Sequence, residues 1–261
     1  IDTSEYEPFA LPIPLDKLVP RMRCYRTDLI HALQFALPAM KTDTNDNRMH
    51  GVRIVGTKTS LLAEATDTFR IHQKYIRATA LTEPAELVVY ATADLPVLLN
   101  LLSGTTVSIG VYDETSYIVT DKNEYILWQY TLQFPNTSRV LPDPANRIAR
   151  LRVSTHALRN ACKSLGKLKK ARYAKTYCEI VPDTNQLVLT CAETQKTVHV
   201  QLYSPAVAQS LQFAIDRYFV LDLLNQLPSH ATVDIGVYPS NGFAITDWQV
   251  VGNDSYYAVI S

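Results

Sequence analysis

The chain has 261 residues, 47% of them hydrophobic, with 25 basic and 25 acidic side chains. This length suits one large or two ordinary domains, and the balanced charge excludes a globally basic nucleic-acid binder. No run reaches the roughly 18 apolar residues of a membrane span, no signal-peptide pattern starts the chain, and the four cysteines lack metal-type spacing. We therefore expect a cytoplasmic protein with free thiols, no metal and no cofactor.

In chain order, residues 1–16 are proline-rich and typical of a linker. Leucine and isoleucine recur at helical spacing over 27–37 and again after Asp94, a candidate N-cap, as far as Gly104. These patterns predict two helices. Alternation of apolar and polar residues predicts strands over 51–56, 61–66, 70–76, 107–112 and 125–134.

The second half follows the same plan. The segment 134–146 contains three prolines and separates the halves. Helices are predicted over 154–165 and 215–228, where Asp216 is a candidate cap. Strands are predicted over 177–182, 186–191, 197–202 and 233–238.

An internal repeat supports this division. Residues 107–121 and 233–247 align without a gap at an offset of 126, with seven of fifteen positions identical. The identical pairs are Val107/Val233, Ile109/Ile235, Gly110/Gly236, Val111/Val237, Tyr112/Tyr238, Thr120/Thr246 and Asp121/Asp247. Each half then has the order β-α-βββ-α-βββ with short turns. This order predicts an α+β fold, two helices packed on antiparallel sheets in each repeat, and not a parallel doubly wound sheet.

Four ordered motifs resemble one family, the bacterial DNA polymerase III β subunit or DNA sliding clamp. They are TDTFRI (66–71), FPNTSRVLP (134–142), FAIDRYFVLDLLNQL (213–227) and NDSYYAVI (253–260). The resemblance implies tandem clamp domains, with 17–133 similar to the family's middle domain, 134–146 a connector, and 147–261 similar to its last domain. The family's first domain has no counterpart in the 261 residues.

The resemblance also implies a function. A clamp is a processivity factor without catalytic activity that encircles duplex DNA and tethers polymerase-type partners through a peptide pocket. Implied partners are duplex DNA, a DNA polymerase, other clamp-motif peptides and a clamp loader, and no membrane. Self-association into a ring is conceivable, but a family-type dimer could not close without a first domain.

The implied peptide pocket lies between the two repeats. Its floor would be aliphatic, and its arginines would hold peptide carbonyls or carboxylates. The alternative is plain inter-domain packing, with Asp67 and Arg70 stabilising a turn. Phe69 departs from the small or polar residue usual in the family. The implied pocket residues are Met49, Thr66, Phe69, Arg70, Ile71, Pro135, Arg139, Val140, Ala258, Val259 and Ile260.

The implied DNA-facing surface is basic. Residues 147–175 contain ten lysines or arginines and no acid, which suits contacts to phosphates without sequence readout. The alternative is a basic helix facing bulk water. The expected DNA-facing residues are Arg150, Arg152, Arg159, Lys163, Lys167, Lys169, Lys170, Arg172 and Lys175.

Catalytic motifs are missing from the sequence. The six histidines are scattered, and no nucleotide-binding glycine motif or nucleophile elbow is present. Two other functions stay open. One is a clamp-like adaptor that recruits partners without encircling DNA, and the other is an unrelated duplicated α+β enzyme.

Overall fold

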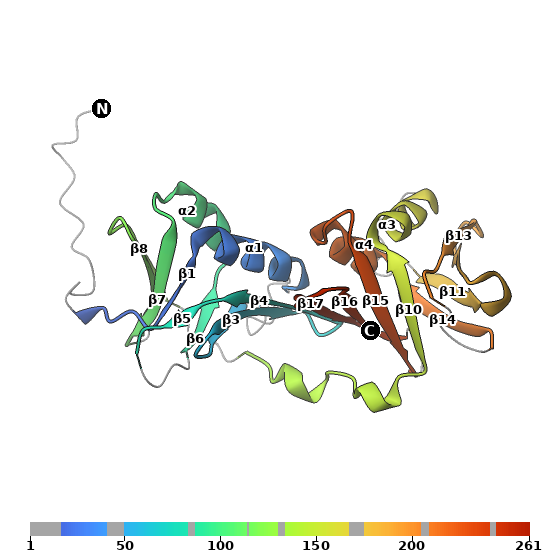
Figure 1. Cartoon of the computed structure of the whole chain (residues 1–261), viewed down its shortest axis with the longest axis horizontal. Helices are drawn as coiled ribbons and strands as arrows, with labels where there is room; N and C mark the ends of the chain where they lie inside the picture. The colour runs from blue at the N-terminus through green and yellow to red at the C-terminus, as the bar shows by residue number, and fades with distance from the viewer. Residues whose placement is uncertain are drawn as a thin grey trace.

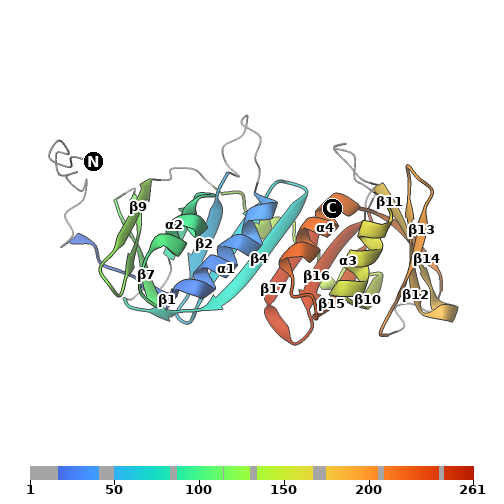
Figure 2. The same ribbon diagram turned by 90° about the horizontal axis from the view of Figure 1, so that it is seen from above.

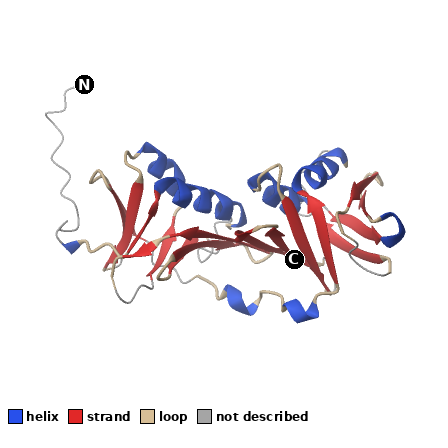
Figure 3. Cartoon of the chain, in the orientation of Figure 1, coloured by secondary structure: helices blue, strands red, loops and turns tan. Residues whose placement is uncertain are grey.

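A computed structural model describes residues 17–40, 50–82, 87–113, 115–129, 134–166, 175–204, 209–240 and 244–261. Its helices lie along one side of an elongated molecule, and the connector runs along the opposite side (Figures 1 and 3). Seen from above, α2, α1, α4 and α3 follow one another across the strands (Figure 2). No helix in these ranges is long and apolar enough to span a membrane.

The first repeat contains two helices and its own strands. Its elements are β1 (Met22–Tyr25), α1 (Arg26–Ala36), a 3-10 turn (Leu37–Ala39), β2 (Val52–Gly56), β3 (Ser60–Thr66), β4 (Arg70–Arg77), β5 (Thr79–Ala80), β6 (Leu87–Ala91), α2 (Leu95–Leu101), β7 (Thr106–Tyr112), β8 (Thr115–Thr120) and β9 (Tyr125–Gln129).

The second repeat follows the connector and has the same order of α-helices and strands, except that none of its described strands corresponds to β5. The connector carries two 3-10 turns (Thr137–Arg139 and Pro144–Asn146). The elements are β10 (Ala149–Ser154), α3 (Thr155–Ser164), β11 (Lys175–Val181), a 3-10 turn (Pro182–Thr184), β12 (Gln186–Cys191), β13 (Thr197–Gln201), β14 (Leu211–Asp216), α4 (Arg217–Gln226), β15 (Thr232–Tyr238), β16 (Ile245–Val250) and β17 (Asn253–Ile260).

Three antiparallel sheets organise these strands. Their orders are β5-β1-β7-β8-β9, β10-β15-β16-β17-β4-β3-β2-β6 and β13-β12-β11-β14. The eight-stranded sheet joins the repeats, because β17 pairs with β4 and places Val259 opposite Ile71. The seam between the repeats is therefore a continuous backbone ladder. The α+β fold with antiparallel sheets is confirmed.

Each repeat packs its own hydrophobic core. One core gathers buried residues between Met22 and Ile118, and the other gathers residues from Ala149 to Ile260. Phe35 of α1 is the exception, because it packs into the second core across the seam. The helices of the second repeat begin at side-chain caps: Ser154 accepts from the backbone N–H of Ala157, and Asp216 accepts from that of Tyr218.

The gap-free repeat alignment holds only in its first part. Val107 pairs with Thr120, whereas Val233 pairs with Val250 and Thr246 pairs with Val237. The segment between β15 and β16 is longer than that between β7 and β8. The pairing register of β15 with β16 is therefore shifted relative to the gap-free sequence alignment. The identities at Thr120/Thr246 and Asp121/Asp247 therefore do not mark equivalent places, and that part of the prediction was wrong.

Candidate functional site

A cavity of about 450 Å³ opens at the seam, on the sheet face opposite the helices. Three segments meet there: the β3–β4 turn, the connector, and the ends of β16 and β17. Because one wall comes from each repeat and a third from the connector, the cavity exists only when both repeats are assembled. Its lining residues are Thr66, Thr68, Phe69, Arg70, Ile71, Pro135, Asn136, Thr137, Val140, Ile245, Val259 and Ser261.

The floor of the cavity is aliphatic. Ile71 and Val259 are cross-strand partners, and both are buried. Val140 and Phe69 stand at the rim and are exposed to solvent, Val140 with 63% of its surface. An aliphatic or aromatic side chain that enters here would gain roughly 1.5–3 kcal/mol from full burial. The site therefore suits apolar anchors on a ligand.

The β3–β4 turn presents Phe69 by local hydrogen bonds. The Asp67 carboxylate accepts from the backbone N–H of Phe69 (3.1 Å) and of Arg70 (3.0 Å). Thr68 has a left-handed φ of 80°, which the turn imposes on a residue that rarely adopts it. The backbone N–H of Ser261 donates to the Phe69 carbonyl at 2.9 Å, so the end of β17 supports the same turn.

Arg70 ties this turn to α4. Its guanidinium donates to Asp67 (2.9 Å) and to Asp222 (2.7 Å), and it lies 4.5 Å from the ring centre of Phe219. Burial raises the pKa of the Asp67 carboxyl above its usual value, while Arg70 acts in the opposite direction. Because its Nε and Nη1 groups bond to these two carboxylates, Arg70 links the turn to α4 as well as lining the cavity.

The predicted pocket residues separate into groups. Thr66, Phe69, Arg70, Ile71, Pro135, Val140 and Val259 line the one cavity. Arg139 is exposed and does not line it. Ala258 and Ile260 alternate with Val259 and point into the second core, as alternate residues of a strand must. Met49 lies outside the described residues.

Sequence reasoning missed part of the lining: Thr68, Asn136, Thr137, Ile245 and Ser261. Asn136 and Thr137 lie inside the connector motif, so the motif could have yielded them. The Thr137 side chain is also fixed in place, because its hydroxyl donates to the buried Glu64 carboxylate at 2.9 Å. Nothing in the residue spacing pointed to Glu64.

The predicted DNA-facing residues that the structure describes do not all lie on one face. Arg150 and Arg152 alternate with the core residues Leu151 and Val153 and so project from the sheet face opposite α3. Both form ion pairs with Asp234, at 2.5 and 2.7 Å. These two arginines therefore lie on the sheet face away from α3, which carries Lys163.

The remaining basic residues have different surroundings. Arg159 donates to the carbonyls of Leu224 and Leu227 at the end of α4. Lys163 is exposed on α3. Lys175 begins β11 with its ammonium 5.1 Å from the ring centre of Tyr177. Lys167, Lys169, Lys170 and Arg172 lie outside the described residues.

The helix side of the first repeat is apolar in part, since Val97, Leu98 and Leu101 of α2 are exposed.

Within the described ranges, no group of His, Cys, Asp and Glu residues could hold a metal ion. The cysteines are buried, and burial raises the pKa of the Cys162 thiol to about 12. A thiol in such a place is a poor nucleophile.

No protein-family model and no curated protein matches the sequence. Solved structures do match. The DNA polymerase sliding clamp from Bacillus subtilis has a TM-score of 0.81 at 15% identity, over 100% of this chain and 67% of the clamp chain. The β subunit from the DNA polymerase of Streptococcus pyogenes has 0.78 at 16%, over 100% and 69%. A sliding clamp from Bartonella birtlesii bound to griselimycin has 0.77 at 18%, over 97% and 68%. The chain therefore has the fold of a bacterial DNA sliding clamp.

Proposed function

We propose that this protein is a non-catalytic sliding-clamp component that encircles duplex DNA and tethers polymerase-type partners through the seam cavity. The observation that carries the proposal is the composition of that cavity, which draws one wall from each repeat and one from the connector. This cavity forms only where both repeats and the connector meet, so a partner bound there would be held to the ring. We take residues 17–133 and 147–261 as the two domains, joined by the connector.

The occupant that fits the cavity is a short, extended peptide with apolar anchors, of the Q-L-x-L-F type. Ile71, Val140 and Val259 would receive an aliphatic side chain, and Phe69 at the rim would pack against an aromatic one. Asn136 and Ser261 lie beside this floor and offer polar groups to the peptide backbone. A few buried anchors of this kind dominate peptide affinity.

DNA would be held without reading its sequence. The basic residues from Lys163 to Lys175 contain no acid between them, and phosphate contacts of this kind are non-specific and sensitive to salt. We propose Lys163, Lys167, Lys169, Lys170 and Arg172 as the main contacts, and leave out Arg150, Arg152 and Arg159, which are engaged within the protein. A clamp loader is a further proposed partner.

A matched pair of exposed valines tests the cavity. Val140 at its rim and Val97 on α2 are each 63% exposed, so an aspartate should disturb the fold equally little at either place. The measurement is binding of a fluorescent Q-L-x-L-F peptide by anisotropy. We expect Val140→Asp to weaken binding at least about tenfold, because a charge would be desolvated beside the apolar anchor. Val97→Asp should bind like the parent.

Equal losses in both variants, or no binding to the parent chain, would contradict the peptide-binding part of the proposal. Ile71→Asp extends the test to the floor. Because Ile71 is buried, this variant needs a thermal unfolding measurement beside it, so that loss of the site is distinguished from loss of the fold.

A further inference from the structure

Three arginines in the described part of the chain join its separate pieces in the same way. Each guanidinium lies over an aromatic ring and pairs with a carboxylate. The three sets, with the distance to the ring centre and then the nitrogen–oxygen distance, are Arg70 with Phe219 (4.5 Å) and Asp222 (2.7 Å), Arg53 with Phe134 (5.8 Å) and Glu64 (3.6 Å), and Arg147 with Tyr238 (5.7 Å) and Asp247 (3.0 Å). They link the first repeat to the second, the first repeat to the connector, and the connector to the second repeat.

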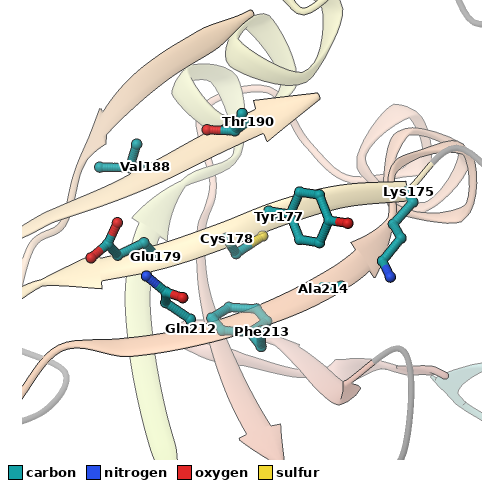
Figure 4. Close-up of a pocket in the computed structure, with 9 residues that line it drawn as sticks. All are labelled: Lys175, Tyr177, Cys178, Glu179, Val188, Thr190, Gln212, Phe213 and Ala214. Carbon is teal, nitrogen blue, oxygen red and sulfur yellow. The ribbon is translucent and has the colours of Figure 1, made fainter. Parts of the chain in front are cut away.

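The four-stranded sheet of the second repeat carries a ring and a carboxylate in a similar relation. Tyr177 and Glu179 are two residues apart on β11, so both project from the face away from the core, about 7 Å from each other along the strand. Together with Val188, Thr190 and Gln212 they line a hollow of about 460 Å³ (Figure 4). None of the described residues that line this hollow is an arginine.

A guanidinium that entered between the Tyr177 ring and the Glu179 carboxylate would contact both groups. A cation is attracted to a ring within about 6 Å of its centre, and an arginine pairs with a carboxylate at about 2.7–2.9 Å. Tyr177 is 48% exposed, so an incoming side chain can reach its ring. Glu179 accepts from the Ser210 hydroxyl at 3.0 Å, and an ionised carboxylate can accept further hydrogen bonds. Val188 lies opposite Glu179 in the ladder and offers an aliphatic surface to the arginine stem.

One cation of the chain already lies near this ring, because the Lys175 ammonium is 5.1 Å from the ring centre of Tyr177. Lys175 begins β11 four residues before Glu179, so the two charged residues are about 13 Å apart along the strand. Figure 4 shows Tyr177 between them. A guanidinium at Glu179 therefore approaches the ring from the end away from Lys175. Arginine suits this end better than lysine, because a planar guanidinium can stack on the ring while it donates to the carboxylate.

We propose that the hollow at Tyr177 and Glu179 anchors an arginine from an extended segment of a partner protein. The carboxylate and the exposed ring select a cation. The connector shows that a sheet face of this fold receives an extended segment, since Phe134 and Thr137 contact Arg53 and Glu64 on the first repeat. Such a partner would be held on the sheet face of the second repeat, apart from the seam cavity.

Matched peptides test the anchor on the full-length chain. The probe is acetylated Ala-Pro-Arg-Pro-Ala amide, in which the prolines keep the backbone extended. Its controls are the same peptide with lysine or with citrulline, which keeps the shape of arginine without its charge. The measurement is the shift of backbone amide signals in the nitrogen-15-labelled chain at low salt. We expect saturable shifts on β11, β12 and β14 with the arginine peptide, weaker binding of the lysine peptide, and none of the citrulline peptide.

Two variants with matched controls locate the binding groups. Glu179→Gln should weaken the arginine peptide at least about fivefold, because it removes the charged acceptor. Glu193→Gln, at an exposed glutamate between β12 and β13 that does not line the hollow, should bind like the parent. Tyr177→Ala should weaken binding about threefold through loss of the ring contact. Tyr218→Ala is its control, because Tyr218 on α4 is 49% exposed.

Three results would overturn the proposal: equal binding of the arginine and citrulline peptides, shifts spread over other acidic surfaces, or equal effects of Glu179→Gln and Glu193→Gln. Sedimentation velocity of the chain without peptide separates a partner protein from a second copy. A shift of Glu179→Gln toward smaller species would assign the hollow to self-association and would also overturn it. The test uses neither DNA nor a Q-L-x-L-F peptide, so its outcome does not depend on the proposed function.

Discussion

At the residue scale, the seam depends on side chains whose neighbours are far away in sequence. His72 on β4 is fully buried, and its Nδ1 lies 3.0 Å from the Phe35 carbonyl of α1. Its ring also packs against the Phe35 ring, with 5.2 Å between centres. Phe35 in turn packs into the core of the other repeat. A neutral His72 therefore belongs to the contact by which one repeat holds the other.

Acid should weaken this contact. Burial, with the nearby Arg70, lowers the pKa of His72 from 6.5 to about 3, against the effect of its bond to Phe35. The unfolded chain takes up the proton first, so the stabilisation is complete above about pH 6.5 and is lost as the pH falls from there toward 3. Because of His72, we expect the free energy of unfolding to fall by roughly 1.4 kcal/mol for each pH unit of acidification in that window.

Urea unfolding of the parent and His72→Gln at pH 7, 6, 5 and 4 would measure this contribution. The glutamine can still donate to the Phe35 carbonyl and does not titrate. The variant should be less stable at pH 7, and the difference between the two proteins should shrink as the pH falls. A difference that stays constant over this range would show that His72 does not titrate with unfolding.

At the element scale, periodicity predicted the four α-helices and most strands, because each of these elements buries a stripe or an alternate set of apolar residues. No range was predicted for the strands β1, β5, β6, β10 and β14. Periodicity also could not predict the direction in which long polar side chains point. Arg159 and Lys163 are one helical turn apart on α3, yet Arg159 bonds to α4 carbonyls and Lys163 is exposed.

These two residues should therefore give opposite results when replaced. Arg159→Met keeps the aliphatic stem but leaves the Leu224 and Leu227 carbonyls without their charged donor. It should cost about 1–3 kcal/mol of stability, with DNA affinity nearly unchanged. Lys163→Met should keep stability and lower DNA affinity, with a salt dependence reduced by about one phosphate contact.

Thermal unfolding and fluorescence anisotropy on a short duplex at several salt concentrations would separate the two effects. A larger loss of DNA affinity in Arg159→Met than in Lys163→Met would contradict the proposal that Lys163 contacts DNA and Arg159 serves the fold. The peptide cavity shows the same limit of sequence reasoning: motifs located Ile71 and Val140, but the engagement of Arg70 by Asp222 depends on how α4 packs across the seam.

At the scale of the whole molecule, the proposed function depends on topology more than on any contact. Phosphate contacts weaken steeply with salt, whereas a closed ring on circular DNA can leave only by opening. Arg150, Arg152 and Arg159 form ion pairs or hydrogen bonds within the protein. The helix side of the first repeat includes exposed apolar residues of α2. The proposed function therefore assigns the retention of DNA to encirclement, with electrostatic attraction as a weaker contribution.

The decisive comparison is between a nicked circular plasmid and the same plasmid after linearisation, each incubated with the chain and then moved to high salt. We expect protein to stay on the circle and to be released when a restriction enzyme cuts it, because only a free end lets a ring slide off. Equal loss from circles and linear DNA on raising the salt would show that the parent chain binds phosphates without encircling DNA, as an adaptor does.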